Sequence, residues 1–172
     1  IIWKDRVYLL CVIDTGKVDS SLPKPEDQPK RGFGITFPNT VQGFVALCLD
    51  RKTGKELWRR KAKDGVPHEG HHGDNDFASA SPTTDGERLY CWFGSAGLYC
   101  YDLDGKKLWE REAHAARPLT PRHIKNNYAP ETQVTDGELI YTYFADQGLF
   151  AHDLDGKLKW KREMKPYKTR YK

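Results

Sequence analysis

The stretch DLDGKKLWERE at residues 102–112 recurs as DLDGKLKWKRE at residues 153–163, a step of 51 residues. When the comparison is extended back to residues 72–112, the same step gives 19 identities in 41 positions without a gap. The step also runs backwards, because Gly54 and Trp58 stand 51 residues before their counterparts in the quoted stretch. Self-similarity at a fixed period marks a repeat architecture, so the sequence predicts a chain built from related units.

One repeat unit contains four short segments with strand character. Residues 88–93 and 98–103 are rich in aromatic side chains, and the segments 77–83 and 107–112 flank them. Asp-Gly pairs lie between segments, and such pairs readily take the positive φ of a tight turn. Four short antiparallel strands in each unit of about 40–50 residues are typical of a propeller blade. The sequence therefore predicts an all-β fold, a partial β-propeller of four-stranded antiparallel blades, with about three blades of a larger ring.

The predicted domain is one incomplete propeller with an insertion. The insertion is rich in proline and charged residues, as is typical of a loop, and is either a tolerated surface insertion or a cap or partner-binding arm. Because a ring takes about 4–8 blades, we expect the remaining blades to belong to a longer parent chain. The expected parts are a first blade at 1–13 and 44–62, an insertion loop at 14–43, blades at 77–113 and 128–164, and a connector or start of a further blade at 165–172.

Each unit carries one tryptophan and one turn glycine at matching positions. A blade is a sheet whose faces must be covered by its neighbours, and a large flat side chain at a fixed position can fill the gap between two blades. Glycine permits a close approach because it has no Cβ. The positions expected to carry this repeated packing are Gly54, Trp58, Gly105, Trp109, Gly156 and Trp160.

These positions belong to a motif. Residues 48–58 read CLDRKTGKELW, and two related copies end at Trp109 and Trp160. The pattern resembles the tryptophan-docking motif of the pyrroloquinoline-quinone-like (PQQ-like) repeat proteins, Ala-x-Asp-x-x-Thr-Gly-Lys-x-x-Trp. Over residues 44–163 the chain is similar to the quinoprotein alcohol dehydrogenase-like superfamily and, more distantly, to the outer-membrane assembly scaffold BamB. The resemblance implies a propeller fold and a periplasmic or extracellular location.

The connector HEGHHGDND, residues 68–76, concentrates histidines and carboxylates that could ligate a divalent metal. Two of its residues, His72 and Asn75, recur one period later as His123 and Asn126, which indicates a role in shaping every connector. The residues that do not recur are the better site candidates, and a solvated polar connector is the alternative interpretation. The candidate metal ligands are His68, His71 and Asp74.

The composition argues against several other classes of function. The net charge is only +4, and no nucleic-acid motif accompanies the basic C-terminal residues, so no nucleic-acid partner is expected. No apolar run approaches the ~18–20 residues of a transmembrane helix. The four cysteines form no C-x-x-C pair, and Cys48 and Cys100 occupy the small-residue position that Ala151 fills in the last copy, which indicates packing.

Together these features favour a non-enzymatic binding or scaffold module that presents a protein or a small ligand with a rigid propeller face. The alternative is a fragment of a PQQ- or metal-dependent oxidoreductase. PQQ enters through the resemblance alone, since this chain lacks the adjacent cysteine pair that PQQ-dependent alcohol dehydrogenases often use. No catalytic residue and no cofactor is assigned from the sequence, and a divalent metal at the connector is what its own residues suggest.

Overall fold

In the computed structural model of the chain, the described residues are 1–28, 37–68, 70, 76–112, 131–144 and 147–164. They contain three four-stranded antiparallel sheets, in each of which every strand pairs with its neighbour in sequence. The first sheet contains β1 (Ile2–Trp3), β2 (Arg6–Val18), β3 (Thr40–Asp50) and β4 (Glu56–Gly65). The second contains β5 (Thr83–Thr84), β6 (Arg88–Trp92), β7 (Leu98–Asp102) and β8 (Lys107–Arg111). The third contains β9 (Val134–Thr135), β10 (Leu139–Phe144), β11 (Gly148–Asp153) and β12 (Leu158–Arg162).

The same register recurs in all three sheets. Each sheet has one row of three cross-strand neighbours, a tyrosine, a small residue and a tryptophan, which we call the tryptophan row. Because side chains alternate between the faces of a strand, the residues of a row lie on one face of their sheet. The small central residue leaves room for the two rings. The rows are Tyr8–Cys48–Trp58, Tyr90–Cys100–Trp109 and Tyr141–Ala151–Trp160.

A tight turn precedes the last strand of each sheet. In the second sheet, the carboxylate of Asp102 accepts hydrogen bonds from the backbone N–H groups of Asp104 and Lys106, and the turn of the third sheet repeats this arrangement. Gly105 then takes a φ of +85°, a left-handed conformation that L side chains rarely adopt. The Asp-Gly pair of the repeat is therefore explained by the geometry of the turn.

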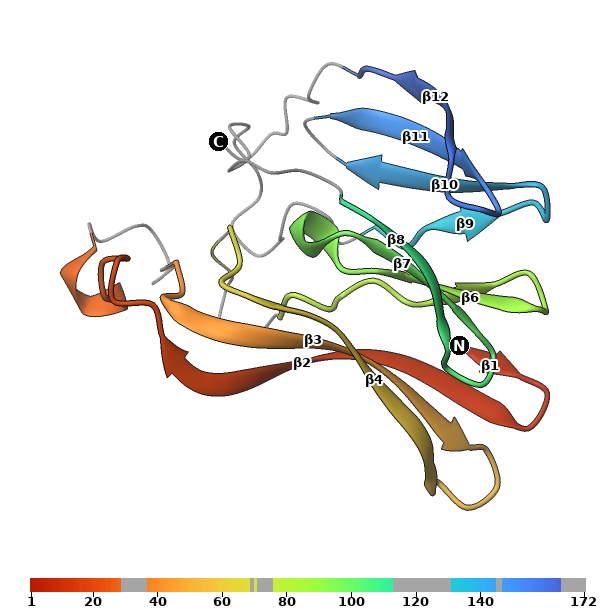
Figure 1. Ribbon diagram of the computed structural model, residues 1–172, viewed down its shortest axis with the longest axis horizontal. Coiled ribbons are helices and arrows are strands. Elements are labelled where there is room, and N and C mark those ends of the chain that lie inside the picture. The colour runs from red at the N-terminus through yellow and green to blue at the C-terminus, as the bar shows by residue number, and fades with distance from the viewer. Residues whose placement is uncertain (29–36, 69, 71–75, 113–130, 145–146, 165–172) are drawn as a thin grey trace, which may run out of the picture.

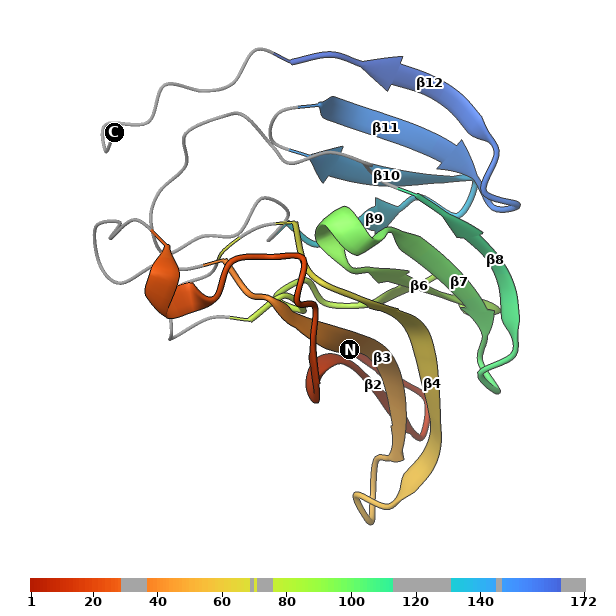
Figure 2. The same ribbon diagram turned by 60° about the vertical axis from the view of Figure 1, so that its left-hand side comes forward.

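The sheets stack face to face in chain order, with the first at one end and the third at the other (Figure 1). A buried cluster that includes Tyr8 and Phe93 lies between the first and second sheets. A second buried cluster, which includes Tyr90 and Phe144, lies between the second and third sheets. The last strands β4, β8 and β12 run along one side of the stack (Figure 2). The second sheet is therefore covered on both faces by its neighbours.

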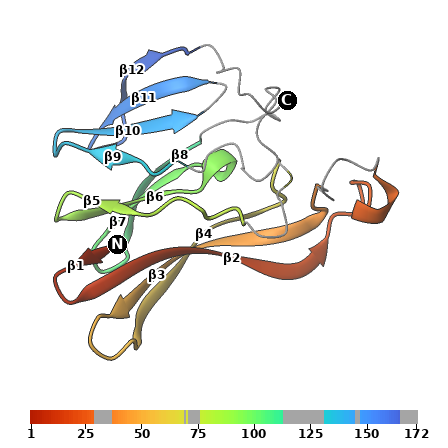
Figure 3. The same cartoon turned by 180° about the vertical axis from the view of Figure 1, so that it is seen from behind.

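Two local expectations differ from the structure. The loop expected at residues 14–43 is shorter, because β2 continues to Val18 and β3 already begins at Thr40, with β-tolerant Thr and Val residues at both ends. The resulting hairpin and the short 3-10 helix η1 (Pro25–Asp27) reach past the other two sheets (Figure 3). The strand expected over 77–83 is reduced to β5, since Pro82 has no N–H to donate to a ladder.

Three stacked, four-stranded antiparallel sheets make this fold a partial β-propeller, as predicted. Within the part of the chain that the structure describes, no helix is long and apolar enough to cross a membrane.

Candidate functional site

The indole of Trp58, on β4, reaches the Asp-Gly turn of the second sheet. Its Nε1 donates a hydrogen bond to the carbonyl oxygen of Leu103 at 3.1 Å. Gly105 lies against the face of the ring, where an added Cβ would stand 2.8 Å from Cδ2 of the indole. Only 8% of Trp58 is exposed. A side chain at Gly105 would therefore displace the indole, because close-packed interiors leave no spare room.

Arg60, two residues after Trp58 on β4, contacts the same turn. Its Nε donates a hydrogen bond to the carbonyl oxygen of Gly105 at 2.7 Å, and its guanidinium carbon lies 5.8 Å from the centre of the Trp58 ring. A guanidinium on an aromatic face is attracted by the ring and adds a rigid donor. We call such a tryptophan, together with the arginine two residues later, a turn clamp.

The second turn clamp copies the first one period later. Trp109 Nε1 donates to the carbonyl oxygen of Leu154 at 2.8 Å, and Arg111 Nε donates to that of Gly156 at 2.5 Å. The guanidinium carbon of Arg111 lies 5.4 Å from the ring centre of Trp109, and an added Cβ at Gly156 would again stand 2.8 Å from the indole. The repeated Trp and Arg therefore join each of the first two sheets to the sheet that follows it.

The two ends of the stack hold the remaining repeat positions. Trp160, on β12, keeps its ring 5.9 Å from that of Tyr141, but 41% of the residue is exposed. At the other end, a Cβ added to Gly54 would meet nothing within 4 Å. Four of the six predicted structural positions thus form two contacts, and the other two lie at opposite ends.

Among the predicted metal ligands, only His68 is a described residue; His71 and Asp74 lie outside the described residues, and so do His72 and Asn75. His68 follows β4 and lines a hollow with Val66 and Pro67. Within the described ranges, no group of three or more His, Cys, Asp or Glu side chains could hold a metal ion. Because two of the three candidate ligands lie outside the described residues, the metal site stays a prediction.

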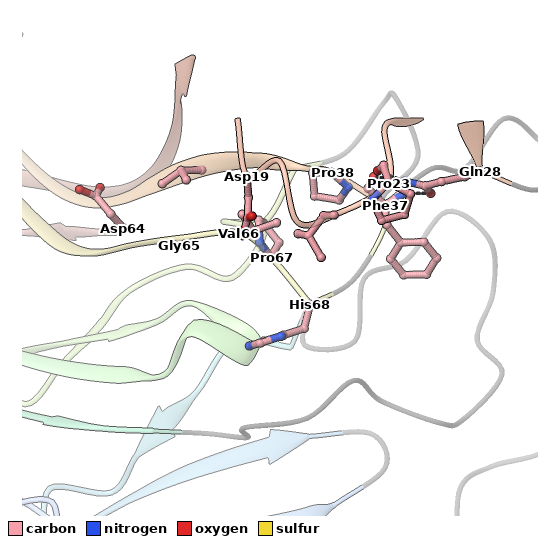
Figure 4. Close-up of a pocket in the computed structure, with 12 residues that line it drawn as sticks. Asp19, Pro23, Gln28, Phe37, Pro38, Asp64, Gly65, Val66, Pro67 and His68 are labelled. Carbon is pink, nitrogen blue, oxygen red and sulfur yellow. Dashed lines mark hydrogen bonds between the residues drawn. The ribbon is translucent and has the colours of Figure 1, made fainter. Parts of the chain in front are cut away.

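The hollow beside His68 has a volume of about 730 Å³. One wall is the segment 64–68, which leaves the end of β4, and the other is the segment that connects β2 to β3. Figure 4 shows Pro23, Gln28, Phe37 and Pro38 of the connecting segment grouped on one side of the hollow. The lining is mainly apolar and includes Pro23, Pro38, Pro67 and Phe37.

Gln28 bridges two parts of the lining of this hollow. Its Nε2 donates hydrogen bonds to the carbonyl oxygens of Phe37 at 2.8 Å and Pro23 at 3.2 Å. Its Oε1 accepts a hydrogen bond from the backbone N–H of Phe37 at 2.9 Å. One side chain therefore joins the two described parts of the connecting segment, in addition to the backbone hydrogen bond from Asp19 N to the carbonyl oxygen of Asn39 at 2.8 Å.

Two carboxylates contribute charge to the lining. Asp19 accepts hydrogen bonds from the Ser21 hydroxyl at 2.6 Å and from its backbone N–H at 3.0 Å, and these bonds hold the pKa of Asp19 below its usual value. Asp64 pairs with Lys61 at 2.8 Å on the exposed surface. The hollow is thus an apolar space with an ionised carboxylate at Asp19.

Three of the four cysteines are buried packing residues, and the fourth, Cys11 on β2, is partly exposed. Cys48, Cys91 and Cys100 are buried, and burial raises the pKa of the Cys100 thiol to about 12. Burial also raises the pKa of the Cys91 thiol well above its usual value. Thiols in such surroundings stay protonated and unreactive, which fits the packing role expected for Cys48 and Cys100.

Two features were missed by sequence reasoning. The first is that Trp58 with Arg60, and Trp109 with Arg111, bind the turn of the following unit; the recurrence of Arg60 as Arg111 was a visible signal for it. The second is the hollow, whose lining comes from the insertion and from Val66 and Pro67. The only lining residue that the sequence singled out is His68, and Gln28 looks like an ordinary polar loop residue.

The chain matches a known protein family. The family model described as "Outer membrane protein assembly factor BamB" matches residues 40–171. Among solved structures, the chain is similar to BamB from Moraxella catarrhalis, with 18% sequence identity, a TM-score of 0.47, and coverage of 72% of this chain and 33% of that chain. The chain therefore spans about a third of the length of that protein, and the comparison with curated proteins finds no match. Since the family model covers well over half of the residues, the chain belongs to the BamB family of outer membrane protein assembly factors.

Proposed function

We propose that this chain is a non-enzymatic binding module whose hollow holds an extended, apolar segment of a partner protein. The observation that carries the proposal is the apolar hollow of about 730 Å³ between the connecting segment and residues 64–68. Binding sites for small groups span roughly 300–1,000 Å³ and are lined mainly by apolar and aromatic side chains with a few polar groups. The hollow has that size and that lining.

The scaffold around the hollow suits recognition of a partner. The connecting segment is mounted on the β2–β3 hairpin, and recognition residues in loops commonly rely on such a rigid support. Gln28 joins Pro23 and Phe37, two described residues of the lining, through three hydrogen bonds. A site that is already ordered loses less conformational freedom when a ligand binds.

The charge of the lining determines which partner segments fit the hollow best. Asp19 is ionised at neutral pH, as an exposed aspartate is, and the hydrogen bonds from Ser21 lower its pKa further. An apolar segment with one arginine or lysine therefore fits better than one with a carboxylate, since like charges repel at short range. The Moraxella catarrhalis protein to which the chain is similar carries the name BamB, and the family is named for outer membrane protein assembly, which is consistent with a protein partner.

The alternative, a fragment of a PQQ- or metal-dependent oxidoreductase, stays a prediction, because two of its three candidate metal ligands, His71 and Asp74, lie outside the described residues. The periplasmic or extracellular location likewise stays a prediction from family resemblance.

A peptide-binding measurement tests the proposal. The probe is a fluorescein-labelled peptide of alternating leucine and threonine with one central arginine, and the matched probe has glutamate in place of arginine. We expect fluorescence anisotropy to show binding of the arginine peptide and weaker binding of the glutamate peptide. Val66→Asp, which adds a carboxylate to the apolar lining, is expected to abolish binding of both.

The control is Val18→Ser, because Val18 is 60% exposed and does not line the hollow. This variant should bind like the unmodified chain. If neither peptide binds, or if Val66→Asp leaves binding unchanged while circular dichroism shows an intact fold, the hollow is not the binding site.

A further inference from the structure

A second hollow, with a volume of about 340 Å³, lies between the first and second sheets. One wall is the turn between β1 and β2, residues 3–6, together with Tyr8, and the other is Leu103 and Asp104 in the turn between β7 and β8. The guanidinium of Arg6 spans the two walls, because it donates hydrogen bonds to the carbonyl oxygen of Leu103 and, at 2.8 Å, to the carboxylate of Asp104. We call this space the Trp3 hollow. It lies at the opposite end of β2 from the connecting segment (Figure 1).

The first wall departs from the repeat at Trp3. The pairing register aligns β1 and β2 with β5 and β6, so that Trp3 stands where the second sheet has Asp85 and the third has Asp136. In those two sheets the aspartate accepts hydrogen bonds from backbone N–H groups of its own turn and from a tyrosine hydroxyl, at 2.8 Å in the second sheet and 2.7 Å in the third. The turn itself therefore favours aspartate at this position, and its closure does not account for the tryptophan.

The next residue, Lys4, departs from the repeat as well. The same register places it at the position of Gly86 and Gly137, whose φ angles are +99° and +91°. Lys4 keeps a positive φ, +52°, and is the only residue other than glycine to do so among those that the structure describes. An L residue is strained in this conformation, and strain of this kind concentrates at functional sites. The backbone favours glycine here, which leaves the lysine side chain as the feature that needs a role.

The indole of Trp3 lies on the face that the second sheet covers. Trp3 pairs with Arg6, and Arg6 and Tyr8 share one face of β2 because side chains alternate along a strand. A Cβ added to Gly86 would stand 3.0 Å from Cζ2 of the indole, so the ring rests on the first turn of the second sheet. Even so, 38% of Trp3 is exposed. The ring is therefore supported by the neighbouring sheet and still accessible to a ligand.

The charges of the lining balance. Lys4 and Arg6 supply hydrogen-bond donors only, and the ionised carboxylates of Asp5 and Asp104 supply acceptors only. An anion would be repelled by the carboxylates and a cation by the basic groups, whereas a hydroxyl group donates and accepts and can bond to both kinds. The exposed part of Trp3 adds an apolar aromatic surface. These groups together suit a neutral ligand that has many hydroxyl groups and an apolar face, which is the chemistry of a pyranose sugar.

We infer that the Trp3 hollow binds a neutral sugar, with a pyranose ring packed against Trp3 and its hydroxyl groups bonded to Lys4 and to the Arg6–Asp104 ion pair. The volume of about 340 Å³ falls in the range of roughly 300–1,000 Å³ that is usual for small-molecule sites. Both walls belong to sheets that already contact each other, so the site is formed before the ligand arrives. It is independent of the peptide site proposed beside His68.

An NMR titration of the indole N–H resonances tests the inference. The probes are three neutral trisaccharides, maltotriose, cellotriose and chitotriose, and the Trp3 resonance is assigned with Trp3→Phe. We expect at least one of them to shift the Trp3 resonance in a saturable manner. Trp160 is the internal control, because it is similarly exposed (41%) and does not line the Trp3 hollow. If no trisaccharide shifts Trp3, or if Trp160 shifts as much as Trp3, the inference is overturned.

Two variants that restore the residues of the other sheets separate binding from stability. Trp3→Asp supplies a carboxylate that can accept the Tyr8 hydroxyl, as Asp85 accepts that of Tyr90, and Lys4→Gly removes the strained conformation. Neither should lower the unfolding midpoint in urea. In saturation-transfer NMR, Trp3→Asp should abolish the sugar signal, and Lys4→Gly should weaken binding by about tenfold through the loss of a charged donor.

Unchanged sugar affinity in Trp3→Asp overturns the inference. Should Trp3→Asp fail to fold, Lys4→Gly decides alone, and unchanged affinity in that variant overturns the inference equally. Val66→Asp, which alters the hollow beside His68, should leave sugar binding as it is. A loss of sugar binding in Val66→Asp with an intact fold would also count against the Trp3 hollow, so the two sites are tested separately.

Discussion

Trp58 and Trp160 stand at the same position of the repeat and in the same pose against a tyrosine, yet their surroundings differ. Trp58 is 8% exposed and donates a hydrogen bond to the following turn, whereas Trp160 is 41% exposed. The local sheet therefore sets the conformation of the tryptophan, and the neighbouring sheet sets its contribution to stability. The Tyr–Trp geometry therefore recurs within a sheet whether or not a following sheet is present to contact the indole.

The largest expected effect comes from removing the buried indole. Trp58→Ala should lower the free energy of unfolding by about 3–5 kcal/mol, because it deletes a large buried side chain and leaves a cavity. Trp160→Ala should cost less than about 1 kcal/mol in dilute solution, since its ring is largely solvated. Urea denaturation followed by circular dichroism measures both. Similar losses for the two variants contradict a role set by the neighbouring sheet.

A smaller effect is expected at the glycines. Gly54→Ala should cost about 1–2 kcal/mol, the price of a left-handed conformation for an L residue. Gly105→Ala carries the same conformational cost, and overpacking against Trp58 should add about 1–3 kcal/mol. The difference between the two free energies of unfolding isolates the indole contact, and a difference near zero argues that the indole moves aside without loss.

The arginine of a clamp should matter less than its tryptophan. Arg60→Met keeps an apolar stem over Trp58 but removes the hydrogen bond to the carbonyl oxygen of Gly105, with an expected loss of about 1–2 kcal/mol. The matched variant Arg162→Met should change the unfolding midpoint in urea very little in a dilute sample. An equal loss at both arginines places the effect within the sheet and not between sheets.

The smallest expected effect is on the pH dependence of stability, through the carboxylate of Asp136. Backbone N–H groups, first that of Leu139, and the Tyr141 hydroxyl lower the pKa of Asp136 to about 2, against 3.8 for an ordinary aspartate. Because the folded pKa is depressed, the stabilisation is present above about pH 4 and is lost as the pH falls towards 2. Asp136→Asn should make the melting temperature less dependent on pH in this window. An unchanged pH profile contradicts a charged Asp136 in the folded state.

The repeat predicted much of this fold, and the reason is physical. The 51-residue step preserves the turn residues Asp102 to Lys106 and Trp109, which fix hairpin geometry and register locally. By contrast, the partner of Trp58 is a carbonyl group 45 residues away, and any residue type provides a carbonyl. The residue type at position 103 therefore does not reveal the hydrogen bond from Trp58.

The candidate site was harder to predict for a related reason. The hollow depends on Gln28 bonding the backbone of Pro23 and Phe37, and backbone groups leave no trace in the sequence pattern. The extended β2–β3 hairpin was missed because residues 14–18 and 40–43 lack an apolar alternation. The metal ligands were chosen by residue type, and two of the three, His71 and Asp74, lie outside the described residues.

The most direct test of the central claim is hydrogen exchange of the indole N–H groups, measured by NMR in a dilute sample with Trp→Phe variants for assignment. We predict slow exchange for Trp58 and Trp109, whose indoles donate to Leu103 and Leu154 of the following sheet, and fast exchange for Trp160. Equal exchange rates for all three indoles would contradict the account, because they would show that the neighbouring sheet does not distinguish them.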